Sequence, residues 1–158
     1  MDSRWRIAPA DFQDPRLVDL LRLHLEAMQR WSPPDSVHAL DLSGLQAPGV
    51  TLFVLWEDEA LLAMGALKTS GDGVGEIKSM RTHPHHLRRG AGRAMLEHLI
   101  AEAARLECGR VSLETGSGEA FEPALNLYRR RGFRSGAAFG DYEATDFNQF
   151  LHLDLTSG

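Results

Sequence analysis

The stretch between residues 76 and 114 constrains the fold of this chain more than any other. Its pattern of apolar side chains predicts a β-strand over residues 76–82, an amphipathic helix over residues 90–106 and a second strand over residues 110–114. Two strands that are joined through a helix pair in parallel, with a right-handed crossover. We therefore expect a sheet that contains at least one parallel pair of strands.

The flanking segments predict antiparallel strands around this unit. Residues 50–57 and 61–68 are rich in apolar side chains and are separated by a short polar turn, which is typical of a hairpin. The tail that follows Phe133 predicts two more strands, the last over residues 147–155. The expected fold class is therefore α/β, with a mixed, mostly antiparallel sheet of six to seven strands, one parallel strand–helix–strand crossover and flanking helices.

The N-terminal part of the chain predicts one more strand and a long helix. The strand covers residues 4–8. Asp14 and Pro15 then supply the residue types preferred at the N-cap and the first position of a helix. Apolar side chains recur at helical spacing as far as Arg30, and a short helical turn is expected over residues 37–42.

Composition limits the class of protein. A chain of 158 residues without internal repeat or linker is expected to form one domain over residues 1–158, and it has no apolar run near the roughly 18 residues that a membrane helix needs. The single cysteine, Cys108, allows no disulfide within the chain, which favours a cytoplasmic location. The net charge of −5 argues against a nucleic-acid partner. His83, His85 and His86 lack the spacing of metal ligands, so no metal site is predicted.

A glycine-rich loop precedes the amphipathic helix. Gly90 and Gly92 lack Cβ atoms, so backbone N–H groups can approach an anion, and the helix directs the positive end of its dipole to the same point. Arg88, Arg89 and Arg93 add positive charge beside the loop. These residues predict a pyrophosphate site; a plain junction between loop and helix, with solvated arginines, is the alternative. The lysine of a P-loop is missing.

Two segments of the chain resemble the GNAT superfamily of N-acetyltransferases. Residues 87–92 are similar to the acyl-CoA-binding motif of that family, Gln/Arg-x-x-Gly-x-Gly/Ala, and residues 124–133 resemble its ending, A-x-x-x-Y-x-x-x-G-F. The resemblance covers roughly residues 52–155. Within the family, the chain is most similar to the YsnE-like branch. Two positions depart from the family pattern: Leu87 replaces the usual Gln or Arg, and Phe121 stands where many members have Asn.

The resemblance implies the GNAT fold and an acetyl-CoA-dependent enzyme. Such an N-acetyltransferase moves an acetyl group to a primary amine, of a small molecule or a peptide, by direct transfer in a ternary complex. A non-catalytic acyl-CoA-binding module and a transferase for another short acyl group are the alternatives, and a homodimer stays open. The residues implied in cofactor binding are Met80, Arg81, Thr82, Leu87, Arg88, Arg89, Gly90, Ala91, Gly92, Arg93 and Tyr128.

Glu76 is the predicted general base. It lies four residues before Met80 on the expected strand, which resembles the position of the base in several GNAT members. Regular strand alternation would put residues 76, 78, 80 and 82 on one face of the sheet. In the alternative interpretation, Glu76 only pairs with Lys78. Glu114, on the neighbouring parallel strand, is a second candidate for the base, so the choice between the two carboxylates stays open.

Met80 and Tyr128 complete the catalytic residues that the resemblance implies. The backbone N–H of Met80 would donate a hydrogen bond to the thioester carbonyl, and the hydroxyl of Tyr128 would protonate the departing thiolate. The alternative role of Tyr128 is to pack a helix against the sheet. Residues 141–143, residues 32–34 and His38 are expected on the side of the acceptor, and a plain turn at Gly140 and Asp141 is the alternative for the first of these segments.

Overall fold

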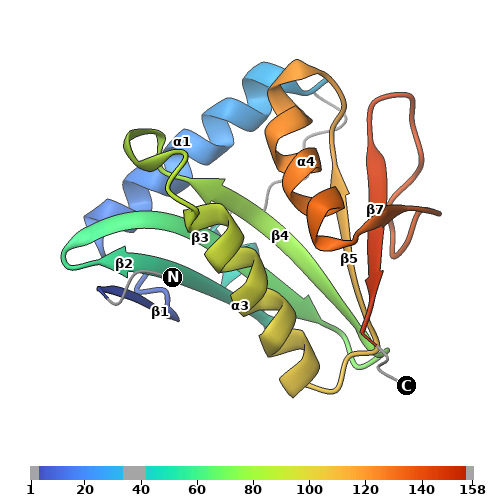
Figure 1. The fold of residues 1–158 in the computed structure, drawn as a ribbon, viewed down its shortest axis with the longest axis horizontal. Helices are drawn as coiled ribbons and strands as arrows, with labels where there is room; N and C mark the ends of the chain where they lie inside the picture. The colour runs from blue at the N-terminus through green and yellow to red at the C-terminus, as the bar shows by residue number, and fades with distance from the viewer. Residues whose placement is uncertain (1–3, 34–41, 156–158) are drawn as a thin grey trace.

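The computed structural model describes residues 4–33 and 42–155, and these form one seven-stranded sheet with helices on both faces (Figure 1). The strand order is β1-β2-β3-β4-β5-β7-β6, and β4 and β5 are the parallel pair. The other neighbouring strands are antiparallel, which confirms the mixed sheet expected from the sequence. The strands are β1 Trp5–Pro9, β2 Val50–Glu57, β3 Ala60–Thr69, β4 Val74–Thr82, β5 Arg110–Thr115, β6 Arg134–Ser135 and β7 Gln149–Asp154.

The helices divide between the two faces of the sheet. Helices α3 and α4 cover the face toward the viewer in Figure 1, and α1 and α2 lie on the opposite face. The helix α1 begins as predicted, because the Asp14 side chain accepts a hydrogen bond from the Arg16 N–H at 2.9 Å. The helical turn expected over residues 37–42 falls mostly outside the described residues. The helices are α1 Pro15–Trp31, α2 Leu42–Leu45, α3 Ala91–Arg105 and α4 Glu122–Arg131, with short 3-10 turns η2 Pro84–His86 and η3 Glu119–Phe121.

Each face of the sheet has its own apolar core. On the α3 face, Met95, Leu96 and Leu99 pack against the strands, and on the α1 face Leu17 and Leu20 do the same. Both central hairpin strands are therefore buried on both sides and read as nearly continuous apolar runs. In the part of the chain that the structure describes, no helix is both long and apolar enough to cross a membrane.

Gly65 on β3 allows the helix α3 to lie close to the sheet. A Cβ atom at this position would lie 2.8 Å from Met80 Sδ, 2.9 Å from Leu99 Cδ1 and 2.9 Å from Met95 Cγ. We expect Gly65→Ala to lower the free energy of unfolding by about 1–3 kcal/mol, because three packed side chains must move to admit one methyl group. Urea denaturation measures the change, and an unaltered midpoint would show that the core absorbs the methyl group freely.

Candidate active site

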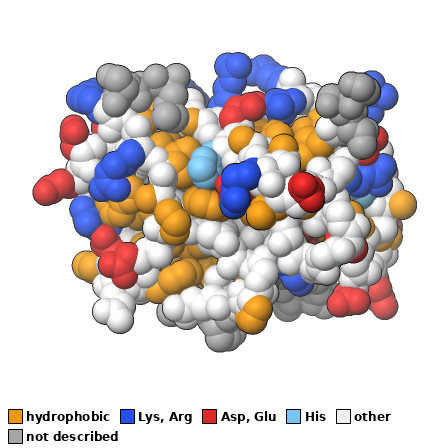
Figure 2. Space-filling model, turned by 90° about the horizontal axis from the view of Figure 1, so that it is seen from below, with side chains coloured by type: hydrophobic (Ala, Val, Ile, Leu, Met, Phe, Trp, Pro, Cys, Tyr) orange, Lys and Arg blue, Asp and Glu red, His pale blue; other side chains and the backbone are white. Residues whose placement is uncertain are grey.

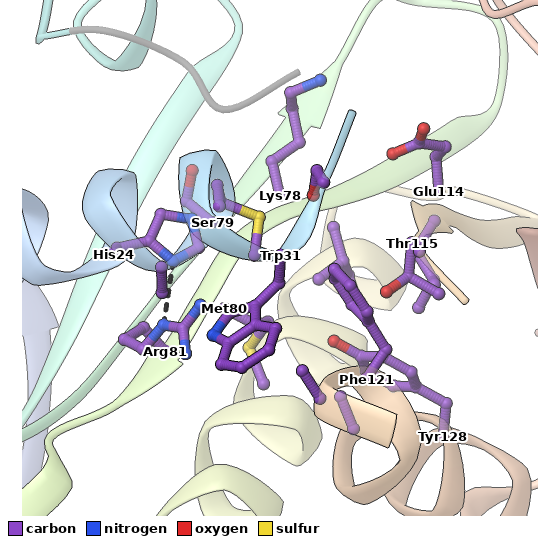
Figure 3. A pocket seen from close by; sticks show the side chains of 18 of the residues that line it. His24, Trp31, Lys78, Ser79, Met80, Arg81, Glu114, Thr115, Phe121 and Tyr128 are labelled. Carbon is purple, nitrogen blue, oxygen red and sulfur yellow. Dashed lines mark hydrogen bonds between the residues drawn. The ribbon is translucent and has the colours of Figure 1, made fainter. Parts of the chain in front are cut away.

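A cavity of about 230 Å³ lies where β4 and β5 separate (Figure 3). The two strands pair from Val74 opposite Arg110 to Ile77 opposite Leu113, and both then continue without pairing to each other. Parts of β4, β5, α1, η3 and α4 line the cavity. The sheet thus opens at its centre and brings side chains from five elements to one place.

A β-bulge in β4 decides which side chains face each side of this opening. Ser79 has a φ of +56°, and the register of β4 against β3 shifts between Met64 and Ala66. Lys78 lies opposite Ala66, and Arg81 lies opposite Met64. Both partners belong to the core on the α1 face, and side chains that lie opposite each other share a face. Lys78 and Arg81 therefore face α1 although three positions separate them.

The bulge corrects the expectation that residues 76, 78, 80 and 82 share one face, which is wrong beyond Ser79. Met80 packs against the core on the α3 face, and Thr82 lies opposite Ala63 of the same core. Glu76 lies opposite Lys68 and faces α1. The physical reason is that one extra residue in the strand inverts the alternation for every residue after it.

Glu114 on β5 lines the cavity, in the upper right of Figure 3. Burial raises the pKa of this carboxyl group to about 7; a hydrogen bond from Asn148 and the charge of Lys78 act in the opposite direction. The amide nitrogen of Asn148 donates to Glu114 Oε2 at 3.3 Å. Glu114 is thus a carboxylate with a pKa close to neutral, which suits a group that accepts and releases a proton.

Glu76 is not among the residues that line the cavity. Its Oε2 accepts hydrogen bonds from Lys78 Nζ at 2.9 Å and from the Tyr142 hydroxyl at 2.5 Å. Lys78 Nζ also donates to the Tyr142 hydroxyl at 2.6 Å. The pairing with Lys78, which the sequence left as the alternative, is therefore present. Lys78 and Tyr142, the two partners of Glu76, both line the cavity.

Tyr128 on α4 is buried at the opposite side of the cavity from α1. Burial raises its pKa to about 12, although the charge of Arg81 acts in the opposite direction. The ring lies 5.8 Å from that of Phe133, so the side chain also packs within the core. At neutral pH Tyr128 carries its proton and is able to donate it.

The predicted phosphate loop leads directly into α3. Gly90 has a φ of +85° just before the helix begins at Ala91, and Arg88 also has a positive φ, of 63°. No side chain caps this helix end, so its first backbone N–H groups are available to an anion. A Cβ atom on Gly92 would lie 3.3 Å from Thr82 Oγ1, which shows how closely the helix approaches β4.

Of the side chains around this loop, one is paired with a distant residue and the others are exposed. Arg89 is turned toward the other end of the sheet, where its guanidinium donates to Glu57 Oε2 at 2.5 Å and lies over the Trp5 ring. Arg88 and Arg93 are exposed beside the loop. Leu87 is 58% exposed and supplies no polar group. The backbone of the loop is thus the better candidate for binding an anion than its side chains.

The helix α1 adds residues that the sequence analysis did not place in the site. His24 and Trp31 line the cavity, and the sequence showed His24 only as part of an apolar stripe. Ser32 and Tyr142, both within the segments expected near the acceptor, also line it, whereas His38 falls outside the described residues. The signal for His24 was a lone polar residue on an apolar helix face, which does not reveal its partner.

Charged side chains of both signs surround the apolar ones on the lower face of the molecule. Figure 2 shows orange apolar side chains in the middle of this face, with blue and red side chains interspersed around them. The part of this face that the structure describes thus carries no continuous basic surface. Among the described residues, no group of three or more His, Cys, Asp or Glu is arranged to hold a metal ion.

The fold and the sequence are those of an acetyltransferase. The model of the acetyltransferase (GNAT) family matches residues 17–133, which is most of the chain, and the chain therefore belongs to this family. The resemblance seen in the sequence is confirmed.

Relatives of known sequence and structure agree with this assignment. The chain is 45% identical to the uncharacterized N-acetyltransferase YsnE of Bacillus subtilis (strain 168) over 145 residues, 92% of this chain and 96% of the relative. It is 41% identical to the uncharacterized N-acetyltransferase YedL of Escherichia coli (strain K12) over 145 residues, 92% of this chain and 91% of the relative. A GNAT family acetyltransferase from Elizabethkingia anophelis, solved with acetyl-CoA bound, shares the fold with a TM-score of 0.70 at 17% identity, covering 98% of this chain and 100% of that one.

Proposed function

We propose that residues 1–158 form one N-acetyltransferase domain that moves an acetyl group from acetyl-CoA to a primary amine by direct transfer in a ternary complex. The observation that carries the proposal is that one cavity holds both a carboxyl group with a pKa of about 7, Glu114, and a protonated tyrosine, Tyr128. The acetyl-CoA bound to the relative from Elizabethkingia anophelis supports the choice of acyl donor. The cytoplasmic location expected from the single cysteine is part of the proposal.

The residues around the opening fit acetyl-CoA, which would supply the acetyl group as a thioester. The uncapped N-terminus of α3 and the loop from Arg88 to Gly92 suit its pyrophosphate. The edge of β4 that faces β5 is unpaired after Ile77, so Met80, Arg81 and Thr82 offer backbone groups to its pantetheine arm. We assign the Met80 N–H to the thioester carbonyl oxygen, where negative charge develops.

We assign Glu114 as the general base. A primary amine with a pKa near 10.4 is protonated at neutral pH, so one proton must leave its nitrogen before the lone pair attacks the carbonyl carbon. Glu114 lines the cavity and Glu76 does not, which favours Glu114 of the two carboxylates. Its carboxylate oxygen receives the proton from the ammonium group, directly or through a water molecule. Glu76 then acts by holding Lys78 and Tyr142 in place.

We assign Tyr128 as the general acid. Its hydroxyl proton moves to the departing sulfur as the carbon–sulfur bond breaks, so CoA leaves as a thiol. The second proton lost by the new amide nitrogen restores the tyrosine hydroxyl through solvent. The products are therefore the acetylated amine, CoA and one released proton, and the enzyme returns to its starting state.

Two measurements test this function. A calorimetric titration with CoA should show binding, and none at millimolar CoA would overturn the cofactor assignment. An assay of thiol release from acetyl-CoA across a library of small amines and peptides should then show turnover with some acceptors. Binding of CoA without transfer to any amine, from acetyl-CoA or from donors with other short acyl groups, would instead indicate a non-catalytic acyl-CoA-binding module.

Gly90→Val should weaken the binding of CoA about tenfold or more. Gly90 lies at φ +85°, where a β-branched residue is strained by about 1–3 kcal/mol, so the loop must leave the conformation that presents its N–H groups. Gly71→Val is the matched control, because Gly71 also has a positive φ, of 78°, with open space around it but lies in the turn between β3 and β4. Calorimetry on both variants checks the prediction, and equal losses in the two would contradict it.

A further inference from the structure

Arg81 is a charged side chain in the cavity whose only hydrogen bond to the described residues goes to a neutral group. Its Nε–H donates to His24 Nδ1 at 3.0 Å (Figure 3). Burial, and then the nearby charge of Arg81, lower the pKa of His24 to about 3, so the imidazole is uncharged at neutral pH. A guanidinium group stays charged under all ordinary conditions.

Arg81 has no anionic partner among the described residues. None of the ion pairs found there includes it. Its two terminal nitrogens donate no hydrogen bond to a described residue, and the side chain lines the cavity. Burial lowers the pKa of Arg81, which shows that the charge is partly removed from water. Such a cation is costly unless an anion pairs with it.

The position of Arg81 indicates which anion is missing. Its side chain faces α1, whereas Met80 and Thr82 on either side face α3 and the phosphate loop. The register of β4 thus places Arg81 on the α1 side of the strand, whereas the start of α3 approaches Thr82 on the other side. The proposed acyl donor thus does not supply the anion, and the acceptor remains.

We infer that the acceptor is an amino carboxylic acid whose carboxylate binds the guanidinium group of Arg81 while its amine lies toward Glu114. This inference rests on the proposed function, because it names the acceptor for the same cavity. Arg81 and Glu114 stand at opposite sides of the cavity in Figure 3, one on each of the separating strands. The planar fork of terminal N–H groups on arginine matches the two oxygens of a carboxylate. Lys78, the other cation of the cavity wall, is already paired with Glu76.

The apolar residues that line the cavity indicate which side chain the amino acid carries. Trp31, Phe121 and Phe147 line the cavity together with Met28. An apolar or aromatic side chain on the amino acid would bury surface against them, which is the usual composition of a small-molecule site. A cavity of about 230 Å³ favours a single amino acid over a long peptide.

The first test uses the wild-type enzyme and three matched acceptors for each apolar amino acid: the free acid, its methyl ester and the amine that lacks the carboxyl group. The free acid should have a kcat/KM at least about tenfold above both others, because only the acid pairs with Arg81. If esters or decarboxylated amines are acetylated as well as the acids, the inference is overturned although the proposed function stands. An aminophosphonate arm shows whether the site prefers a tetrahedral anion, and such a preference would also overturn the inference.

The second test measures binding and does not depend on turnover. In the presence of CoA, calorimetry should show that the free acid binds the wild type at least about tenfold more tightly than Arg81→Met. Arg81→Lys should fall between the two, because it keeps the charge but not the fork. Arg22→Met is the control for a lost charge on the α1 side, because Arg22 is exposed on α1 and, among the described residues, pairs only with Asp19 and Glu26 of that helix.

The two tests separate the inference from the proposed function. If no amine is acetylated but the acid binds in an Arg81-dependent way, the inference on the ligand stands and the catalytic proposal fails. If the acid does not bind the wild type, the inference is overturned whatever the enzyme acetylates. Unfolding curves of both Arg81 variants show whether they are folded, and the comparison of acceptors on the wild type decides the question if they are not.

Discussion

Glu114→Gln should lower kcat for acetyl transfer by about 10²–10⁴-fold while CoA binds with unchanged affinity. The amide of Gln has nearly the same shape as the carboxyl group but cannot accept the proton of the ammonium group. Because Glu114 lies in the cavity and burial raises its pKa to about 7, it is the carboxylate best suited to this step. Initial rates of thiol release with a saturating amine measure the effect.

Two variants serve as comparisons for Glu114→Gln. Glu102→Gln changes a half-buried α3 residue that pairs with Arg105 and does not line the cavity, so its activity should equal that of the wild type. Glu76→Gln should lower activity less than Glu114→Gln, because Glu76 positions Lys78 and Tyr142 without reaching the cavity. The assignment of the base would be wrong if Glu76→Gln had the larger effect on kcat and Glu114→Gln left it intact.

The pH profile gives an independent reading of the same group. Glu114 acts as a base only when it is deprotonated, so activity should rise with pH through about 7 in the wild type. Burial raises the pKa of Glu114 above that of an ordinary glutamic acid, so this rise in activity, the acidic limb of the profile, moves to higher pH. The limb should be missing in the residual activity of Glu114→Gln and present in Glu76→Gln. A limb that survives in Glu114→Gln would belong to another residue.

Tyr128→Phe should lower kcat by about 10²-fold with little change in the free energy of unfolding. Phenylalanine keeps the ring that packs against Phe133 and removes only the hydroxyl that protonates the departing sulfur. Stopped-flow measurement of thiol release, beside a urea unfolding curve, separates the two roles. A parallel loss of stability and activity would support the packing role that the sequence left open.

The leaving group provides a sharper test of Tyr128. A sulfur that departs readily as a thiolate needs no acid, so an acetyl donor with a more acidic thiol should reduce the defect of Tyr128→Phe. The ratio of wild-type to variant rates is then compared between the two donors. A ratio that does not change with the acidity of the thiol would mean that Tyr128 acts on binding or packing instead of protonating sulfur.

The sequence was sufficient for the fold because its signals were local. The hairpin and the crossover followed from apolar patterns within single segments, and the start of α1 from Asp14 and Pro15. The junction between the glycine-rich loop and α3 was predicted for the same reason, since Gly90 and the helix that follows are neighbours in the chain, and its role in binding phosphate stays a prediction. These features depend on residues a few positions apart, and such signals survive without knowledge of the tertiary structure.

The candidate site was predicted less well because its geometry depends on contacts between distant segments. The bulge at Ser79 follows no residue rule, since serine rarely takes a positive φ, and it placed Arg81 and Met80 on unexpected faces. The pairing of Arg81 with His24 joins residues 57 positions apart. The raised pKa of Glu114 likewise comes from burial that forms only when the whole domain has folded. None of these three features can be recognised from the local sequence pattern.

A single-turnover experiment with acetyl-CoA and an active amine, followed by mass spectrometry of both amine and protein, tests most directly whether the cavity transfers acetyl groups as proposed. The acetyl group should appear on the amine at the same rate as free CoA is released, and the mass of the protein should stay constant throughout. Acetylated protein that forms before the acetylated amine, or CoA release without any acetylated amine, would contradict direct transfer in a ternary complex.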